Sequence, residues 1–188
     1  MNGTARGTRA TRRPLTEVAQ AAIAEVLRPG SLAIDATMGN GHDTLFLARC
    51  VAPGGRVIAF DVQPAALDAT RRRLVDAGLH DLVELRQVGH EHLASRLPDG
   101  WCGRVDAAMF NLGYLPGGDK SIVTTGGTTT RALTAALEVM STEGRLSVML
   151  YRHHADASPE VDAVEHWLSG LSDSWSITQH CSPGPVLY

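Results

Sequence analysis

The chain has 188 residues, of which 44% are apolar and 20% are charged. This length suits one domain whose core is stable without cross-links, and the composition is that of an ordinary globular protein. The formal net charge of −3 excludes a general electrostatic attraction to nucleic acid, so any such binding must use a local patch.

Cysteine usage and hydropathy indicate a reducing, cytoplasmic setting. Cys50, Cys102 and Cys181 are far apart and form no C-x-x-C pair, which argues against a disulfide framework and a zinc knuckle. No apolar run approaches the roughly 18 residues of a membrane span, and no signal-peptide core follows the N-terminus. We therefore expect no association with a membrane.

Residues 1–14 are expected to form a basic arm, followed by a single domain over 15–188. The arm contains no acidic residue, and its arginines are Arg6, Arg9, Arg12 and Arg13. A disordered tail, an arm that touches phosphate and an organellar transit peptide are three interpretations of this composition.

Helical and strand patterns alternate along the rest of the chain. Apolar periodicity, glycine and proline predict helices over residues 15–27, 42–48, 64–77, 91–97, 128–140 and 159–171. Short apolar runs predict strands over 31–36, 56–60, 82–86, 104–110, 145–151 and 174–181. This alternation implies an α/β, Rossmann-like domain with a mainly parallel sheet and helices on both faces.

The turn after the first predicted strand separates two classes of cofactor. A dinucleotide site requires G-x-G-x-x-G, whereas Asp35-Ala-Thr-Met-Gly-Asn-Gly41 has no third glycine at that offset. The acid that ends the strand would repel a phosphate and could hold an ammonium group. S-adenosylmethionine carries an amino-acid moiety and a sulfonium but no phosphate, so the turn favours this cofactor.

A second acid, Asp61, ends the second predicted strand, 26 residues after Asp35. A carboxylate there can accept hydrogen bonds from both ribose hydroxyls of an adenosine, and Gln63 lies within reach of the same edge. NAD-binding proteins place an acid similarly. A purely structural explanation is that these carboxylates cap helices, as Asp43 could do at the start of a helix.

The fourth predicted strand leads into a polar loop, Asn111-Leu-Gly-Tyr-Leu-Pro-Gly-Gly-Asp-Lys120, which contains the only lysine of the chain. Amino-directed methyltransferases carry an Asn/Asp-Pro-Pro-aromatic loop at this place. In that scheme the amide oxygen of Asn111 orients the target amine and Tyr114 stacks on the ring that bears it. An ordinary turn with a buried tyrosine is the alternative.

Three segments together resemble one family: the ten-residue loop, Asp35-Ala-Thr-Met-Gly-Asn-Gly-His-Asp-Thr44 and Phe60-Asp-Val-Gln63. The chain resembles, over about residues 15–170, the bacterial class I methyltransferases labelled putative rRNA methylases. Members of this family are understood to methylate 5-aminomethyl-2-thiouridine at the tRNA wobble position. The resemblance implies a seven-stranded sheet whose last, antiparallel strand is short at Pro185-Val-Leu-Tyr188.

The resemblance also implies residue roles. The residues around S-adenosylmethionine would be Asp35, Thr37, Asn40, Gly41, Asp43, Asp61, Gln63, His90, Asn111 and Gly113. Those at the methyl-transfer centre would be Asn111, Gly113, Tyr114, Asp119 and Lys120. Tyr151 and the adjacent Arg152-His-His154 could also reach the substrate, or form a surface turn. Relatives follow the fifth strand with a glycine-containing turn and a glutamate, from which Arg152–Ala157 departs.

Two further motifs can be explained without a function in binding or catalysis. His90 and His92 lie two apart, but no cluster of acids or cysteines completes a metal shell, so no metal is expected. Arg71-Arg-Arg73 on a predicted helix is either a solvated face or an RNA contact.

We therefore expect an S-adenosylmethionine-dependent N-methyltransferase that acts on the anticodon region of tRNA. The alternatives are methylation of another RNA base, as in rRNA, methylation of a small-molecule amine, a non-catalytic S-adenosylmethionine-binding partner, and a Rossmann oxidoreductase. The sequence leaves open whether two copies form a homodimer.

Overall fold

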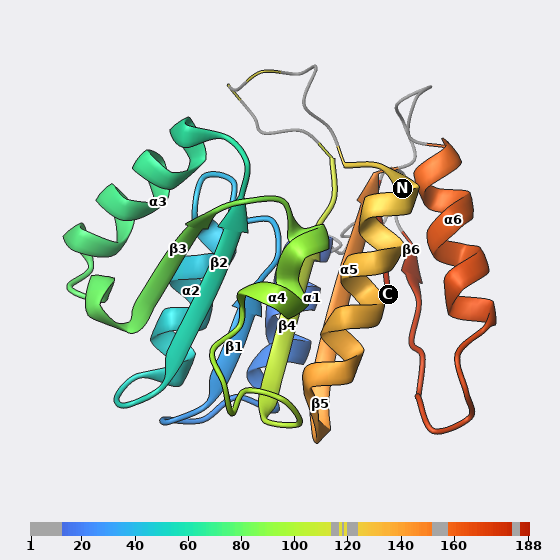
Figure 1. Cartoon of the computed structure of the whole chain (residues 1–188), viewed down its shortest axis with the longest axis horizontal. Coiled ribbons are helices and arrows are strands. Elements are labelled where there is room, and N and C mark those ends of the chain that lie inside the picture. Colours follow the sequence, from blue (N-terminus) through green and yellow to red (C-terminus); the bar gives the residue numbers. More distant parts are fainter. Residues whose placement is uncertain (1–12, 114–116, 118, 120–123, 152–157, 182–184) are drawn as a thin grey trace, which may run out of the picture.

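The computed structural model describes residues 13–113, 117, 119, 124–151, 158–181 and 185–188. They form a seven-stranded sheet with the strand order β3-β2-β1-β4-β5-β7-β6 (Figure 1). The strands are β1 (Leu32–Asp35), β2 (Arg56–Asp61), β3 (Val83–Gln87), β4 (Val105–Asn111), β5 (Met140–Tyr151), β6 (His180–Cys181) and β7 (Pro185–Leu187). The first five strands of the order are parallel, and β7 is antiparallel to both β5 and β6.

Helices cover both faces of the sheet. They are α1 (Leu15–Ala24), α2 (His42–Val51), α3 (Pro64–Asp76), α4 (Leu93–Arg96), α5 (Gly126–Val139) and α6 (Ser158–Ser169), with 3-10 turns η1 (His80–Leu82) and η2 (His90–His92). Figure 1 shows α5 and α6 in front of the sheet and α1 and α2 behind it. Among the described residues no helix has the length and apolar character that a membrane crossing requires.

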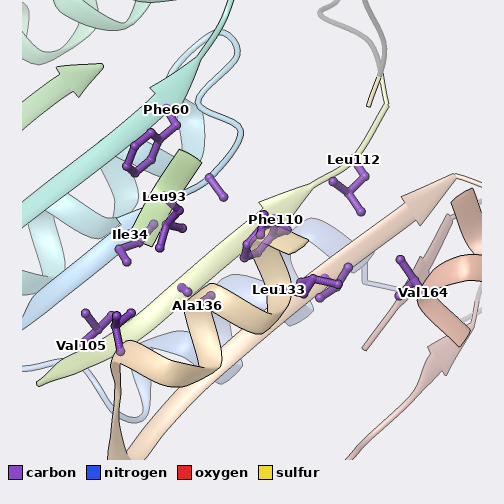
Figure 2. Packing of buried hydrophobic residues seen from close by; sticks show 14 of the residues in the cluster. Ile34, Phe60, Leu93, Val105, Phe110, Leu112, Leu133, Ala136 and Val164 are labelled. Atoms are coloured by element: carbon purple, nitrogen blue, oxygen red, sulfur yellow. The ribbon is translucent and has the colours of Figure 1, made fainter. Parts of the chain in front are cut away.

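Two apolar clusters, one on each face of the sheet, hold these layers together. On one face Phe110 of β4 and Phe60 of β2 pack with Leu133 of α5 and Val164 of α6 (Figure 2). On the other face Ile23 of α1 belongs to a cluster with residues of α2 and α3. Because both faces are covered, the central strands are apolar in nearly every position, as parallel strands usually are.

The strand order reverses direction between β1 and β4. The chain goes outward from β1 to β2 and β3, and then returns to the other side of β1 to start β4 and β5. The loops that follow β1 and β4 therefore diverge and leave a crevice at the carboxyl edge of the sheet. Ligands of open α/β sheets bind at such a crevice.

The predicted fold class is confirmed, with corrections at several element ends. The predicted strand 174–181 is wrong except for its last two residues: of that segment only His180 and Cys181 pair with a neighbouring strand, the three-residue β7. Helix α1 ends at Ala24 rather than Leu27, with Glu25 as its C-cap. Strand β5 starts at Met140, five residues earlier than predicted.

The packing of α5 generates a stability prediction. Leu133 is fully buried in the cluster shown in Figure 2, so Leu133→Ala leaves a cavity and should lower the free energy of unfolding by about 2–5 kcal/mol. The melting temperature should fall by about 10 °C in a chain of this size. Val75→Ala is the control: its side chain is 53% exposed, so the melting temperature should hardly change.

Candidate functional site

A pocket of about 480 Å³ opens at the carboxyl edge of the sheet, where the strand order reverses. Its walls come from the segments that follow β1, β2, β3 and β4, from the start of α5 and from the end of β5. A volume of this size is typical of a site for a small molecule or cofactor.

The turn after β1 is built around the carboxylate of Asp35. This side chain is 1% exposed, and its oxygens accept hydrogen bonds from the Thr44 hydroxyl (2.6 Å) and the Thr37 backbone N–H (3.1 Å). Burial, and then the negative charge of Asp43, raise the pKa of Asp35 to about 7, although both hydrogen bonds lower it. Asp35 thus lies beneath the pocket wall rather than in it.

Gly41 ends this turn and precedes the first residue of α2. Its φ angle is +78°, a conformation that residues with a side chain rarely adopt. A Cβ atom at Gly41 would also lie 2.7 Å from the hydroxyl oxygen of Thr70 on α3. The glycine therefore lets α2 and α3 approach each other closely, and the Thr70 hydroxyl donates to the carbonyl of Gly39 at 3.2 Å.

Asp61 at the end of β2 forms the next part of the wall. Its carboxylate accepts hydrogen bonds from the backbone N–H groups of Gly39 (3.0 Å) and Gln63 (2.9 Å), so it joins the turns after β1 and β2. The buried side chain of Gln63 in turn accepts a hydrogen bond from the Asp119 backbone N–H at 3.1 Å. This contact ties the loop after β4 to the end of β2.

Asn111 occupies the junction between the turn after β1 and the loop after β4. Its backbone N–H donates to the Thr37 hydroxyl at 2.7 Å. Its side chain hydrogen-bonds the phenol of Tyr151. Burial and the nearby charge of Asp43 raise the pKa of that phenol, and the hydrogen bond to Asn111 offsets only part of the rise. Asp43 also accepts a hydrogen bond from the Gln20 side chain at 2.8 Å, which positions it at the pocket wall.

His90 carries an unsatisfied polar atom. The residue is 6% exposed, lines the pocket and packs edge-to-face on Phe110. Burial lowers the pKa of the imidazole, and the negative charges of Glu91 and Glu160 and a hydrogen bond to the Ala36 backbone oppose this. The Nε2 atom finds no hydrogen-bond partner among the described residues, and such a buried orphan costs free energy unless a ligand satisfies it.

Most of the predicted site residues meet at this pocket. Those that line it are Thr37, Asn40, Asp43, Asp61, Gln63, His90, Asn111 and Gly113. Asp35, Gly41 and Asp119 do not line it but contact or adjoin residues that do. Tyr114, Lys120 and the turn 152–157 lie outside the described residues, as do Arg6, Arg9 and Arg12 of the basic arm.

The structure adds residues that the motifs did not reveal. Thr124, Thr125 and Thr128 line the pocket at the start of α5, and Thr125 caps this helix. Glu160 of α6 is 8% exposed and accepts hydrogen bonds from the Thr124 hydroxyl (2.9 Å) and the Thr129 hydroxyl (2.7 Å). The sequence offered one signal for Glu160, which is an acidic residue in the first turn of a helix. Acidic residues are common at this position in helices that have no part in a functional site.

Acidic groups dominate the charge of the pocket. Asp43, Asp61 and Glu91 line it, and the described lining contains no lysine or arginine. Such a wall disfavours a pyrophosphate group and suits a ligand with positive charge.

These features define the class of the protein as the Rossmann-like methyltransferase fold, whose ligand crevice lies at the reversal of strand order. The family model described as "Putative rRNA methylase" matches residues 57–183, and the chain belongs to this family.

Two solved structures of similar length support the assignment. A Clostridium thermocellum protein described in the same words is 34% identical, with a TM-score of 0.88 over 94% of this chain and 96% of that one. A Streptococcus mutans methyltransferase in complex with SAH is also 34% identical, with a TM-score of 0.77 over 94% and 97% of the two chains.

Curated relatives are longer. A chloroplastic tRNA (mnm(5)s(2)U34)-methyltransferase of Arabidopsis thaliana is 38% identical over 168 residues, which are 85% of this chain and 61% of the relative. Ribosomal RNA small subunit methyltransferase H of Brevibacillus brevis is 34% identical over 87 residues, 46% of this chain and 27% of that protein. The chain thus spans less than two thirds of either relative.

The raised pKa of Asp35 predicts a pH-dependent stability difference. Folded Asp35 holds its proton up to about pH 7, whereas an unfolded aspartate releases it near pH 4. Between these values a rise in pH therefore destabilises the folded state. Asparagine does not titrate, so the unfolding free energy of Asp35→Asn minus that of the wild type should grow by on the order of 4 kcal/mol from pH 4 to 7 and then level off.

Urea unfolding of both proteins at several pH values measures this difference. The control is Asp68→Asn, because the Asp68 side chain is 60% exposed and forms only a surface ion pair with Arg71. Its unfolding free energy relative to the wild type should change little with pH. A constant difference for Asp35→Asn would contradict the raised pKa.

Proposed function

We propose that the protein is an S-adenosylmethionine-dependent N-methyltransferase that converts 5-aminomethyl-2-thiouridine at the tRNA wobble position into 5-methylaminomethyl-2-thiouridine. The observation that carries this proposal is the position of Asn111, which joins the turn after β1 to the substrate loop at the reversal of strand order. The Arabidopsis relative named for a wobble-uridine methyltransferase supplies the substrate class.

The described residues fit S-adenosylmethionine better than a dinucleotide. The carboxylates of Asp43 and Asp61 line the pocket, where they favour a cationic ligand without phosphate. Asp35 lies beneath this wall, and a nearby ammonium group would lower its pKa and favour its ionised form. The bound cofactor supplies a methyl group on a sulfonium, which an amine can attack.

His90 and Asp61 would hold the adenosine part. The Nε2 atom of His90 is buried and unpartnered, and burial keeps the ring neutral. Since the ring already hydrogen-bonds the Ala36 backbone, Nε2 is left as an acceptor for an amino group of the ligand. Asp61 accepts two backbone bonds and retains lone pairs for ribose hydroxyls.

Asn111 would orient the target amine. Its side chain hydrogen-bonds the phenol of Tyr151, and in the proposed arrangement the amide nitrogen is the donor in this bond. That bond leaves the amide oxygen to accept from the amine and to aim its lone pair at the methyl carbon. Positioning of this kind is the main contribution that a protein makes to methyl transfer.

The loop beyond Asn111 would complete the substrate side. Gln63 binds the backbone of Asp119 and so holds the loop over the end of β2. Tyr114 keeps the role proposed from the sequence, stacking on the uridine ring. Lys120, expected at the methyl-transfer centre, would favour the neutral amine by its charge.

Methylation of an rRNA base by the same site is the second candidate, favoured by the description of the family and by the relatives named for ribosomal RNA. The cellular compartment is also part of the proposal. We place the enzyme in the cytoplasm, although the Arabidopsis relative is named as chloroplastic.

Asn111→Ala should reduce kcat about 100-fold or more because the amine loses its orienting acceptor, while binding of S-adenosylhomocysteine remains measurable by calorimetry. Tyr151→Phe keeps the ring but removes the hydrogen bond to Asn111, so it should cause a smaller loss of kcat. Wild-type turnover in Asn111→Ala would remove the orienting role.

Mass spectrometry of nucleosides tests the substrate. Purified protein incubated with S-adenosylmethionine and tRNA that carries 5-aminomethyl-2-thiouridine should convert this nucleoside into the form with one additional methyl group. Bulk rRNA and the Asn111→Ala protein serve as controls. Methylation of rRNA with unchanged tRNA would replace the proposed substrate by the second candidate.

A further inference from the structure

A second hollow, of about 550 Å³, lies between α2 and α3 on the surface of the domain. Leu45 and Arg49 line it from α2, one helical turn apart. The α3 side consists of Ala69, Arg72, Arg73, Asp76 and Ala77. The spacing of Ala69, Arg72, Arg73 and Asp76 places them along one face of α3. We call this hollow the arginine groove.

The charge of the groove is positive and largely uncompensated. Three guanidinium groups line it against the single carboxylate of Asp76. Arg49 and Arg72 are exposed, and neither forms an ion pair with another described residue. The adjacent Arg71 differs, since it pairs with Asp68 at 3.0 Å. The groove therefore presents free guanidinium forks to solvent.

Arg73 connects the groove to the pocket. Its Nε–H donates to the carbonyl of Asn40 at 2.9 Å, and its terminal nitrogen lies 3.3 Å from Nε2 of His42. Asn40 and His42 both line the pocket, whereas Arg73 lines the groove. A long ligand could occupy the groove while one of its units reaches the rim of the pocket.

We propose that the arginine groove binds the phosphodiester backbone of RNA. Guanidinium forks match phosphate oxygens in geometry and charge. The acidic lining of the pocket repels phosphate, and the chain as a whole carries a net charge of −3, so a polyanion needs a separate basic surface. This inference rests on the proposed function, because it supplies the backbone contact that an RNA methyltransferase requires.

Helix stabilisation is the competing explanation for these arginines. Arg49 and Arg73 lie in the last turns of α2 and α3, where a cation interacts favourably with the helix dipole. Arg72 has no such position in α3 and still faces the groove. Helix stabilisation predicts an effect on melting temperature, whereas a backbone contact predicts an effect on the salt dependence of RNA binding.

The test is fluorescence anisotropy with a labelled anticodon stem-loop RNA at several NaCl concentrations. The double variant Arg49→Gln/Arg72→Gln should weaken binding about tenfold at low salt. It should also reduce the slope of log K against log salt by about 1.5, since each lost phosphate contact removes about 0.7–0.9. Arg73 is kept, because its bonds hold Asn40 and His42 at the pocket rim.

Two further variants separate the explanations. Arg96→Gln/Arg131→Gln removes the same charge from exposed arginines of α4 and α5, on the opposite face of the sheet, and should bind RNA like the wild type. Arg49→Lys/Arg72→Lys retains the charge and should retain most of the salt slope. Equal weakening in both glutamine pairs, or a lower melting temperature with an unchanged slope, would overturn the proposal.

RNA binding is measured here without methyl transfer, which separates the two possible failures. If the wild type methylates tRNA but the groove variants bind RNA with its affinity and slope, the groove assignment alone is wrong. If the wild type binds RNA through the groove but methylates no tRNA, the proposed function alone is wrong.

Discussion

The hydrogen bond from the Asn111 backbone to the Thr37 hydroxyl is the contact on which the site depends. It joins the carboxyl ends of β1 and β4, two strands that are adjacent in the sheet but 74 residues apart in the chain. At this point the strand order reverses and the following loops diverge, so a crevice must open there. The bond places the proposed orienting amide beside the turn that is proposed to hold the cofactor.

Charge is segregated between the two hollows of the molecule. Carboxylates line the pocket at the sheet edge, and guanidinium groups line the groove between α2 and α3. A single surface could not favour both a sulfonium cation and an RNA polyanion. The hydrogen bonds of Arg73 to the pocket rim bring the two surfaces together without mixing their charges, so a chain of net charge −3 offers separate surfaces for the two proposed ligands.

Two buried polar groups at the pocket, Asp35 and His90, lower the stability of the fold. Asp35 is a fully buried carboxyl whose pKa is raised to about 7, and the Nε2 atom of His90 is buried without a partner among the described residues. Both features cost free energy until a ligand compensates them. Strained or unsatisfied groups of this kind are expected at functional sites, where local stability is given up for binding.

The sequence by itself determined the fold class and most of the pocket. Alternating apolar runs and helical stripes predicted the parallel sheet, and an acid or amide directly after a strand predicted Asp61 and Asn111 at one edge, because parallel strands end at the same edge. Only the tertiary structure decided which groups lie beneath the wall, as Asp35 does, and which distant side chains contact residues of the wall, as Glu160 contacts Thr124 and Arg73 contacts Asn40. These outcomes depend on burial and on contacts between elements far apart in the chain, which local periodicity does not encode.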